Sequence, residues 1–211
     1  FVIKYTFEKS ADKSFLYYFI RRFIRLYIPL FFIYILGYLL KCQAEGQLAS
    51  PEWGHLLGNL FMLQDVISQK PNVIAPAYMD NGVLWSLSYE WWFYMLFFYL
   101  SKKIAPEKLN KWVGIITILA AASYIIYPFF LNRLVMYFAI WWIGVQFAEI
   151  YLRGENFSFL NIRPFAGVLL VITGILALNL YVHFAYTKVY SYPLVAYPFV
   201  ELRHFVFAVM V

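Results

Sequence analysis

Residues 165–182 read FAGVLLVITGILALNLYV, a run of apolar and small residues without a single charged side chain. A helix needs about 20 mostly apolar residues to cross the hydrocarbon core of a bilayer, so this stretch predicts a membrane-spanning helix. The sequence therefore predicts an all-α, polytopic transmembrane bundle with about five complete spans and a sixth that begins near His204. The other four predicted spans are Phe23–Leu40, Val83–Leu100, Trp112–Leu131 and Leu134–Leu152.

The overall composition points to the same class of protein. Hydrophobic residues make up 64% of the 211 residues and charged residues 13%, whereas soluble domains have roughly 45–50% and 25%. So few polar residues cannot cover a soluble globule, and a disordered, collagen-like or coiled-coil chain is excluded as well. The aromatic share of 23% is typical of the aromatic belts at membrane interfaces. Cys42 is the single cysteine, so no internal disulfide can form.

The two ends of the chain predict a piece of a longer protein. The chain begins at Phe1 without an initiator methionine, and its last apolar run stops at Val211. We expect residues 1–211 to form a single membrane-embedded domain that is incomplete at both ends, with residues 1–3 as the tail of a preceding span.

Positive charges are distributed unevenly between the connecting segments. If five spans alternate in direction, residues 4–25, 101–111 and 153–163 lie on one side, and they hold 12 of the 17 Lys and Arg residues. The positive-inside rule places this side in the cytoplasm. The net charge of +6 is thereby explained by membrane topology, and we expect no nucleic-acid partner.

A cluster of arginines lies where the chain enters the first predicted span. Ser14 can cap a helix over residues 15–25, and Arg21, Arg22 and Arg25 then follow one another at spacings that place them on one side of that helix. Guanidinium groups bind phosphate oxygens in a bidentate manner, so the cluster is a candidate site for an anionic cofactor. The alternative is that these residues only anchor the protein to lipid headgroups. Pro29, which lacks an N–H, predicts a kink or the restart of a helix.

Glu90 is the most conspicuous single residue because it lies within a predicted span. Such a carboxylate is costly in the bilayer and is expected to face the bundle interior or a wet cavity. Ser86 and Tyr94, one turn away on either side, can reach it on the same helical face. Glu90 is therefore either a functional residue or a carboxylate that ties two helices together through a hydrogen bond or an ion pair.

Other polar residues provide weaker signals. The stretch Trp53–Ile67 is too short to span and predicts a helix that lies on the outer face. No spacing of His, Cys, Asp or Glu predicts a metal site, and no histidine is assigned as a base. Glu149 and Arg153 are expected to form an ordinary pair one helical turn apart.

Two segments together resemble the integral-membrane acyltransferase family 3. Residues 19–27, FIRRFIRLY, are similar to the family's R-x-x-R element, with Arg22 and Arg25 as the pair, although Pro29 follows by four residues instead of three. Residues 84–94, LWSLSYEWWFY, are similar to the W-S-L-x-x-E-x-x-F-Y element. The matching positions are Trp85, Ser86, Leu87, Glu90, Phe93 and Tyr94.

The resemblance implies an activity. Members of the family O-acylate polysaccharides and related acceptors of the cell envelope, so it implies transfer of an acyl group, expected to be acetyl, from cytoplasmic acyl-CoA to a carbohydrate hydroxyl. It also implies an integral protein of the bacterial inner membrane, surrounded by lipid, without a metal.

The resemblance also implies roles for residues. Arg22 and Arg25, with Arg21 beside them, would bind the phosphates of acyl-CoA, and Glu90 would support catalysis. Trp85, Ser86 and Tyr94 would shape the site, and the outer segments 41–82 and 183–203 would help to bind the acceptor. The family's catalytic histidine lies in the first transmembrane helix, which we expect to be missing here, so the piece alone is expected to be inactive.

Two other functions are compatible with the residues alone. In a membrane transporter, Glu90 would belong to a polar pathway, and in a non-catalytic membrane scaffold it would serve a helix–helix contact. Activity that depends on acyl-CoA distinguishes the enzyme from both.

Overall fold

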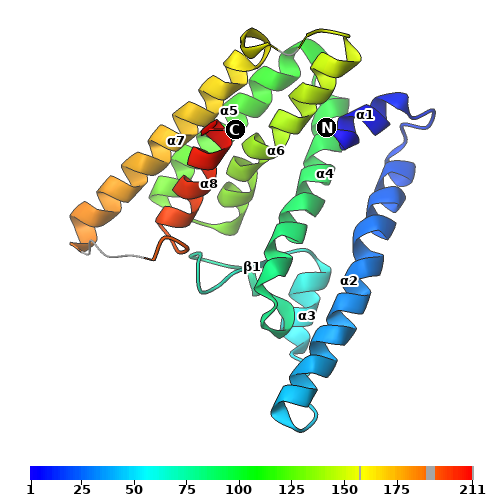
Figure 1. Cartoon of the computed structure of the whole chain (residues 1–211), viewed down its shortest axis with the longest axis vertical. Coiled ribbons are helices and arrows are strands. Elements are labelled where there is room, and N and C mark those ends of the chain that lie inside the picture. Colours follow the sequence, from blue (N-terminus) through cyan, green and yellow to red (C-terminus); the bar gives the residue numbers. More distant parts are fainter. Residues whose placement is uncertain (157, 189–192, 211) are drawn as a thin grey trace. The chain divides into compact units, whose positions relative to one another are not determined.

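The computed structural model describes residues 1–156, 158–188 and 193–210. Helices dominate these residues, which confirms the predicted all-α class, and residues 189–192 of the predicted outer segment 183–203 lie outside them. In chain order (Figure 1) the elements are α1 Val2–Lys9, α2 Phe15–Glu45, α3 Trp53–Leu60, β1 Gln64–Asp65, β2 Ala75–Pro76, the short 3-10 turns η1 Tyr78–Asp80 and η2 Gly82–Leu84, α4 Trp85–Lys103, α5 Pro106–Ile126, α6 Phe130–Leu152, α7 Phe159–Thr187 and α8 Phe199–Met210.

Four helices of the described residues are long and apolar enough to cross a membrane. They are α2, α5, α6 and α7, which correspond to four of the five predicted spans. The fifth predicted span forms the 19-residue helix α4 but is not among the four. The protein is therefore an integral membrane protein.

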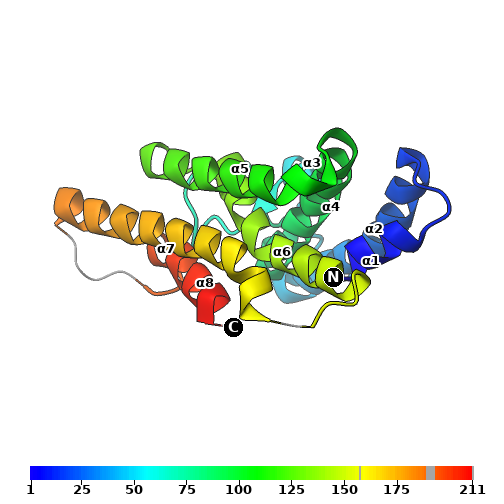
Figure 2. The ribbon, with the colours of Figure 1, turned by 90° about the horizontal axis from the view of Figure 1, so that it is seen from above.

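The chain divides into two compact units, which are described separately. The first unit consists of residues 1–11 and 100–211. In it, α5 packs against α6 and α7, α7 packs against α8, and α1 packs against α6 (Figure 2). Its core is built from large side chains that are completely buried, among them Phe138, Trp142 and Ile172.

The boundary between α5 and α6 differs from the prediction. The span was expected to continue to Leu131, but α5 ends at Ile126 and α6 begins at Phe130. Pro128 cannot donate a backbone hydrogen bond, and the Asn132 side chain stabilises the break by accepting from the Phe129 N–H at 3.0 Å and donating to the Tyr127 carbonyl at 2.8 Å. Hydropathy thus predicted a break between the two spans but placed it too far along the chain.

The second unit consists of residues 12–99 and contains α2, α3, the two short strands and most of α4. The Ser14 hydroxyl accepts a hydrogen bond from the Tyr17 N–H at 3.4 Å, which confirms the predicted N-cap of α2.

The helix α2 continues without interruption through Pro29, so the predicted restart at this residue is wrong. One missing N–H is tolerated because the hydrogen bonds on both sides of it keep a long apolar helix intact in lipid. Gly46, with φ of 67°, ends the helix in the left-handed conformation.

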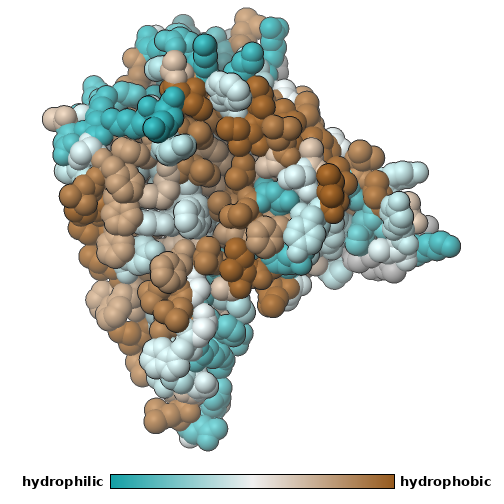
Figure 3. Space-filling view, turned by 180° about the vertical axis from the view of Figure 1, so that it is seen from behind, coloured by the Kyte–Doolittle hydropathy of each residue, from teal (hydrophilic) through white to brown (hydrophobic). Residues whose placement is uncertain are grey.

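Large apolar side chains remain exposed on the protein surface, as a lipid environment requires. Phe31, Phe32, Leu36 and Leu40 of α2 are exposed, and Figure 3 shows broad hydrophobic areas on the molecular surface. In a water-soluble monomer apolar patches of this kind are rarely large, whereas lipid tails cover them at no cost.

The helix predicted over Trp53–Ile67 is shorter than expected. α3 ends at Leu60, and the chain then forms β1, which pairs in parallel with β2 through Gln64 opposite Ala75 and Asp65 opposite Pro76. α3 packs against β2 at Gly58, where an added Cβ atom would lie 2.4 Å from the Ala75 Cβ. Only a residue without a side chain allows this approach of helix and strand.

We predict that Gly58→Ala destabilises the protein by about 1–3 kcal/mol, because the new methyl group overlaps Ala75. Gly54→Ala is the matched control on the same helix, since an added Cβ there meets nothing within 4 Å. The control is expected to be neutral or slightly stabilising, because Ala favours the helix. Thermal unfolding in detergent measures both variants, and equal midpoints would contradict the prediction.

Candidate active site

Arg22 of α2 lies buried between two aromatic rings. Its guanidinium carbon is 5.3 Å from the centroid of the Tyr18 ring and 5.4 Å from that of the Tyr94 ring. The Tyr18 hydroxyl donates to the backbone carbonyl of Tyr94 at 3.0 Å, which joins α2 to α4 at this level. Aromatic faces attract a cation, and the attraction grows as water is removed. The two tyrosines therefore make a favourable site for a buried guanidinium.

Glu90 of α4 is connected to the same cluster through Tyr94. The Tyr94 hydroxyl donates a hydrogen bond to Glu90 Oε1, as the one-turn spacing predicted. Glu90 is half-buried, and the positive charges of Arg25 and Arg22 act on its carboxylate. The second unit thus brings together one residue of the first motif, Arg22, and two residues of the second, Glu90 and Tyr94.

The three arginines, which the sequence predicted to share one side of the helix, differ in exposure. Arg22 is buried, whereas Arg21 and Arg25 are exposed. Arg21 Nη1 donates to the Tyr17 hydroxyl at 3.2 Å, and its guanidinium lies over the Tyr17 ring. Consecutive residues of a helix are rotated by about 100°, so Arg21 and Arg22 must point in different directions.

Ser86 does not bond to Glu90 in the part of the chain that the structure describes. Its hydroxyl is exposed and donates to the Val83 carbonyl at 3.2 Å, within the first turn of α4. A serine near a helix N-terminus commonly bonds to its own backbone in this way. Trp85 is half-buried at the start of α4, one turn before Tyr89.

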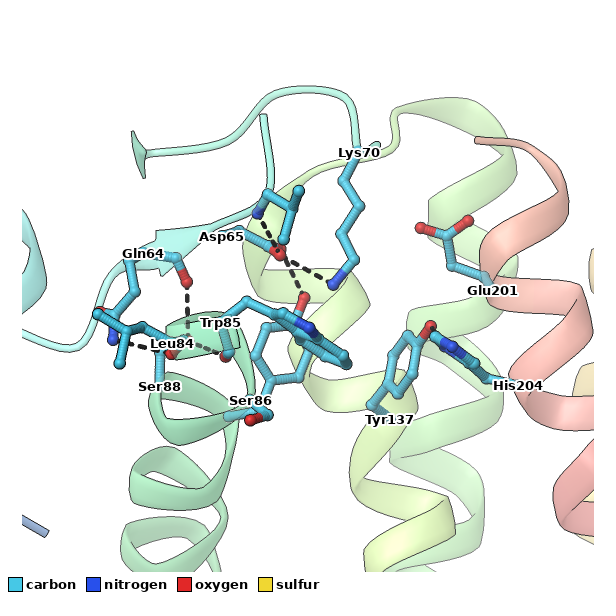
Figure 4. A network of polar contacts seen from close by, with 12 residues as sticks. Gln64, Asp65, Lys70, Leu84, Trp85, Ser86, Ser88, Tyr137, Glu201 and His204 are labelled. Carbon is cyan, nitrogen blue, oxygen red and sulfur yellow. Dashed lines mark hydrogen bonds and ion pairs between the residues drawn. The ribbon is translucent and has the colours of Figure 1, made fainter. Parts of the chain in front are cut away.

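A buried ion pair, which the sequence did not predict, lies beside Trp85. Lys70 Nζ donates to Asp65 Oδ1 at 2.8 Å, and the two side chains are 1% and 0% exposed. The Tyr89 hydroxyl donates to Asp65 Oδ2 at 2.7 Å, and Lys70 Nζ lies 3.4 Å from the centroid of the Trp85 ring. Figure 4 shows Asp65 and Lys70 pointing toward one another beside Trp85.

Backbone contacts hold this pair against α4. The Ser88 hydroxyl donates to the Gln64 carbonyl at 2.8 Å, and Gln64 Nε2 donates to the Leu84 carbonyl at 3.1 Å. The Trp92 indole N–H donates to the Met62 carbonyl at 2.8 Å. No short-range pattern predicted these contacts, because about 20 residues separate Asp65 and Lys70 from their partners on α4.

The histidines are engaged in separate contacts. His55 Nδ1 lies 2.9 Å from Glu52 Oε2 in the second unit, where the Lys41 ammonium donates to Glu52 and lowers the pKa of that carboxyl. In the first unit, His204 Nδ1 lies 2.7 Å from the Tyr137 hydroxyl (Figure 4). Among the described residues, no group of three or more His, Cys, Asp and Glu side chains could hold a metal ion.

Two polar clusters stabilise the first unit. Tyr124 of α5 donates to Glu201 Oε1 of α8 at 2.8 Å, and both side chains are completely buried. Glu149, predicted to form an ordinary helix pair with Arg153, also lies 3.5 Å from Lys4 Nζ of α1 and accepts from Asn110 Nδ2 of α5 at 3.1 Å. Glu149 therefore joins three elements instead of bracing one helix.

We predict that Asp65→Asn alone destabilises the protein by about 3–5 kcal/mol, because it removes the carboxylate charge that faces the buried Lys70 ammonium. Lys41→Ala is the comparison, since its ion pair with Glu52 is partly exposed, with side chains 24% and 25% accessible. Its expected cost is at most about 1 kcal/mol. Thermal or denaturant unfolding in detergent measures both, and a smaller loss for Asp65→Asn than for Lys41→Ala would refute the prediction.

Comparison with protein families identifies the relationship that both motifs suggested. A family model described as an acyltransferase domain matches residues 1–210. No curated protein and no solved structure matches the chain.

Proposed function

Because the chain belongs to acyltransferase family 3, we propose that it serves to move an acyl group from cytoplasmic acyl-CoA to a hydroxyl group of an extracytoplasmic or lipid-linked carbohydrate. The family establishes a membrane acyltransferase in general. We propose acetyl as the acyl group, the bacterial inner membrane as the location, and modification of cell-envelope polysaccharide as the outcome.

One observation carries this proposal. The two motif segments are about 60 residues apart in the sequence, yet the contact of α2 with α4 places the Arg22 guanidinium against the Tyr94 ring, next to Glu90. A buried cation beside a half-buried carboxylate is costly in an apolar helical protein, so such an arrangement is a functional-site candidate by default.

In the proposed mechanism, Arg25 meets the donor. Its guanidinium is exposed on the side predicted to be cytoplasmic, where it can form bidentate hydrogen bonds to the phosphates of acyl-CoA. Arg22 is buried one turn earlier and contacts the Tyr94 ring, so it helps to position the hydroxyl group that bonds to Glu90.

The chemical step requires a general base for the acceptor hydroxyl. The family resemblance assigns this role to a histidine of the family's first transmembrane helix. In the proposed step the base removes the hydroxyl proton, the oxygen attacks the thioester carbonyl, and CoA leaves as its thiolate, which is then protonated. Glu90 stabilises the positive charge of the protonated histidine and keeps its ring oriented, with Tyr94 fixing the carboxylate.

We predict that Glu90→Gln in the intact protein abolishes acyl transfer while the amount of protein in the membrane stays normal. Glutamine keeps the volume and an acceptor for Tyr94 but removes the charge. Glu107→Gln, at an exposed position in the first turn of α5, is the matched control and should be fully active. Transfer from radiolabelled acetyl-CoA in native membrane vesicles measures the effect. Normal activity of Glu90→Gln would contradict the role, and flux without acyl-CoA would favour a transporter.

We predict that Arg25→Ala raises the KM for acyl-CoA by about tenfold, the effect of losing one charged contact of about 1.4 kcal/mol. Arg163→Ala removes an exposed arginine on the same predicted side of the membrane, and it should leave this KM unchanged. Initial rates at varied acetyl-CoA concentration give the comparison. An unchanged KM for Arg25→Ala would refute the assigned contact.

A further inference from the structure

The Asp65–Lys70 pair touches the first turns of the helix that carries Glu90. Asp65 Oδ1 accepts from Lys70 Nζ and from the Val66 N–H at 2.9 Å, and Oδ2 accepts from the Tyr89 hydroxyl. The Lys70 ammonium lies over the Trp85 ring and 4.9 Å from the centroid of the Tyr89 ring. One carboxylate and one ammonium group thus set the positions of two aromatic side chains of α4.

Stability alone does not explain why charges occupy this position. Removing an ammonium and a carboxylate from water is costly, and apolar residues of similar volume often stabilise a protein as well or better. The charged pair orients its neighbours, because the carboxylate accepts a hydrogen bond from a hydroxyl group and the ammonium group attracts the face of an aromatic ring. The arrangement is therefore suited to fixing the orientation of rings.

Trp85 is the ring of this arrangement that keeps an accessible part. The Trp85 and Tyr89 rings meet edge to face, with centroids 5.1 Å apart and planes at 87°. Trp85 remains half-buried, whereas Tyr89, Asp65 and Lys70 are buried. A large rigid ring with one accessible part offers contact area at a low entropic cost.

We propose that Asp65 and Lys70 are positioning residues of the acyl-transfer site, which act by holding the Trp85 indole as a wall of the binding site for the carbohydrate acceptor. This inference rests on the proposed acyltransferase function. Loss of the pair frees the indole to adopt other orientations, so binding of the acceptor weakens while binding of the donor does not change.

The test uses Asp65→Asn together with Lys70→Met in the intact protein. Asparagine keeps an acceptor oxygen for the Val66 N–H, and its amide N–H can donate to the Tyr89 hydroxyl oxygen. Methionine keeps the apolar stem beside Trp85, and the two substitutions together remove both charges of the pair. The intact protein is reconstituted into liposomes with increasing amounts of total glycolipid extract from the producing cells, and release of CoA from acetyl-CoA is followed.

We expect the double variant to unfold near the temperature of the unmodified protein. The amount of glycolipid that gives half-maximal rate should rise by about tenfold, whereas the KM for acetyl-CoA should change by less than about twofold. Complete loss of transfer in a folded variant that still binds acetyl-CoA supports the proposal in the same way. A purely structural role lowers only the maximal rate through a smaller folded fraction, so an unchanged half-saturating amount of glycolipid overturns the proposal.

Two further variants separate the possible causes. Lys4→Met with Glu149→Gln removes another ion pair, whose atoms are 3.5 Å apart, and should leave half-saturation by glycolipid unchanged. If the first double variant does not fold, Lys70→Arg replaces it, because arginine keeps the charge but changes the group that holds the indole. A smaller shift in the same direction is then expected, and no shift overturns the proposal. An unmodified protein that releases no CoA with any acceptor overturns the proposed function instead.

Discussion

The packing of α2 against α4 through aromatic rings is the contact on which the candidate site depends. Trp91 of α4 meets Phe19 and Tyr27 of α2 edge to face, at centroid distances of 5.3 and 5.2 Å. Such pairs prefer defined geometries, so they determine how one helix is rotated against the other. That rotation turns Arg22 toward Tyr94 and leaves Arg21 and Arg25 outside. Without these aromatic contacts, the two motif segments would not be held next to each other.

A second constraint is the cost of charge in an apolar protein. Arg22 lies between two tyrosine rings, Asp65 and Lys70 pair with one another, and Glu201 accepts from Tyr124. Each arrangement replaces part of the lost hydration, and each uses aromatic side chains for this purpose. The high share of tyrosine therefore serves the interior of the protein as well as its membrane interfaces.

Much of the fold could be predicted because its cause is local. Runs such as residues 165–182 require a helix wherever they enter lipid, and Ser14 marks the start of α2 through a contact only three residues long. The errors have equally local reasons. Pro128 and Asn132 break an apolar run whose hydropathy is continuous, and Gln64 and Asp65 join a strand where an apolar pattern predicted more of α3. Hydrogen bonds between residues close in sequence determine where such helices end, and a hydropathy average over many residues does not detect them.

The candidate site was predictable only in part. The sequence by itself determined the helical membrane architecture and the Glu90–Tyr94 contact, because a spacing of four residues places two side chains on one helical face. Only the tertiary structure decided that Arg22 is the buried arginine of its motif and that Asp65 and Lys70 hold Trp85 and Tyr89. These contacts join residues that lie far apart along the chain, and their geometry follows from how helices and loops pack against one another, which no local periodicity specifies.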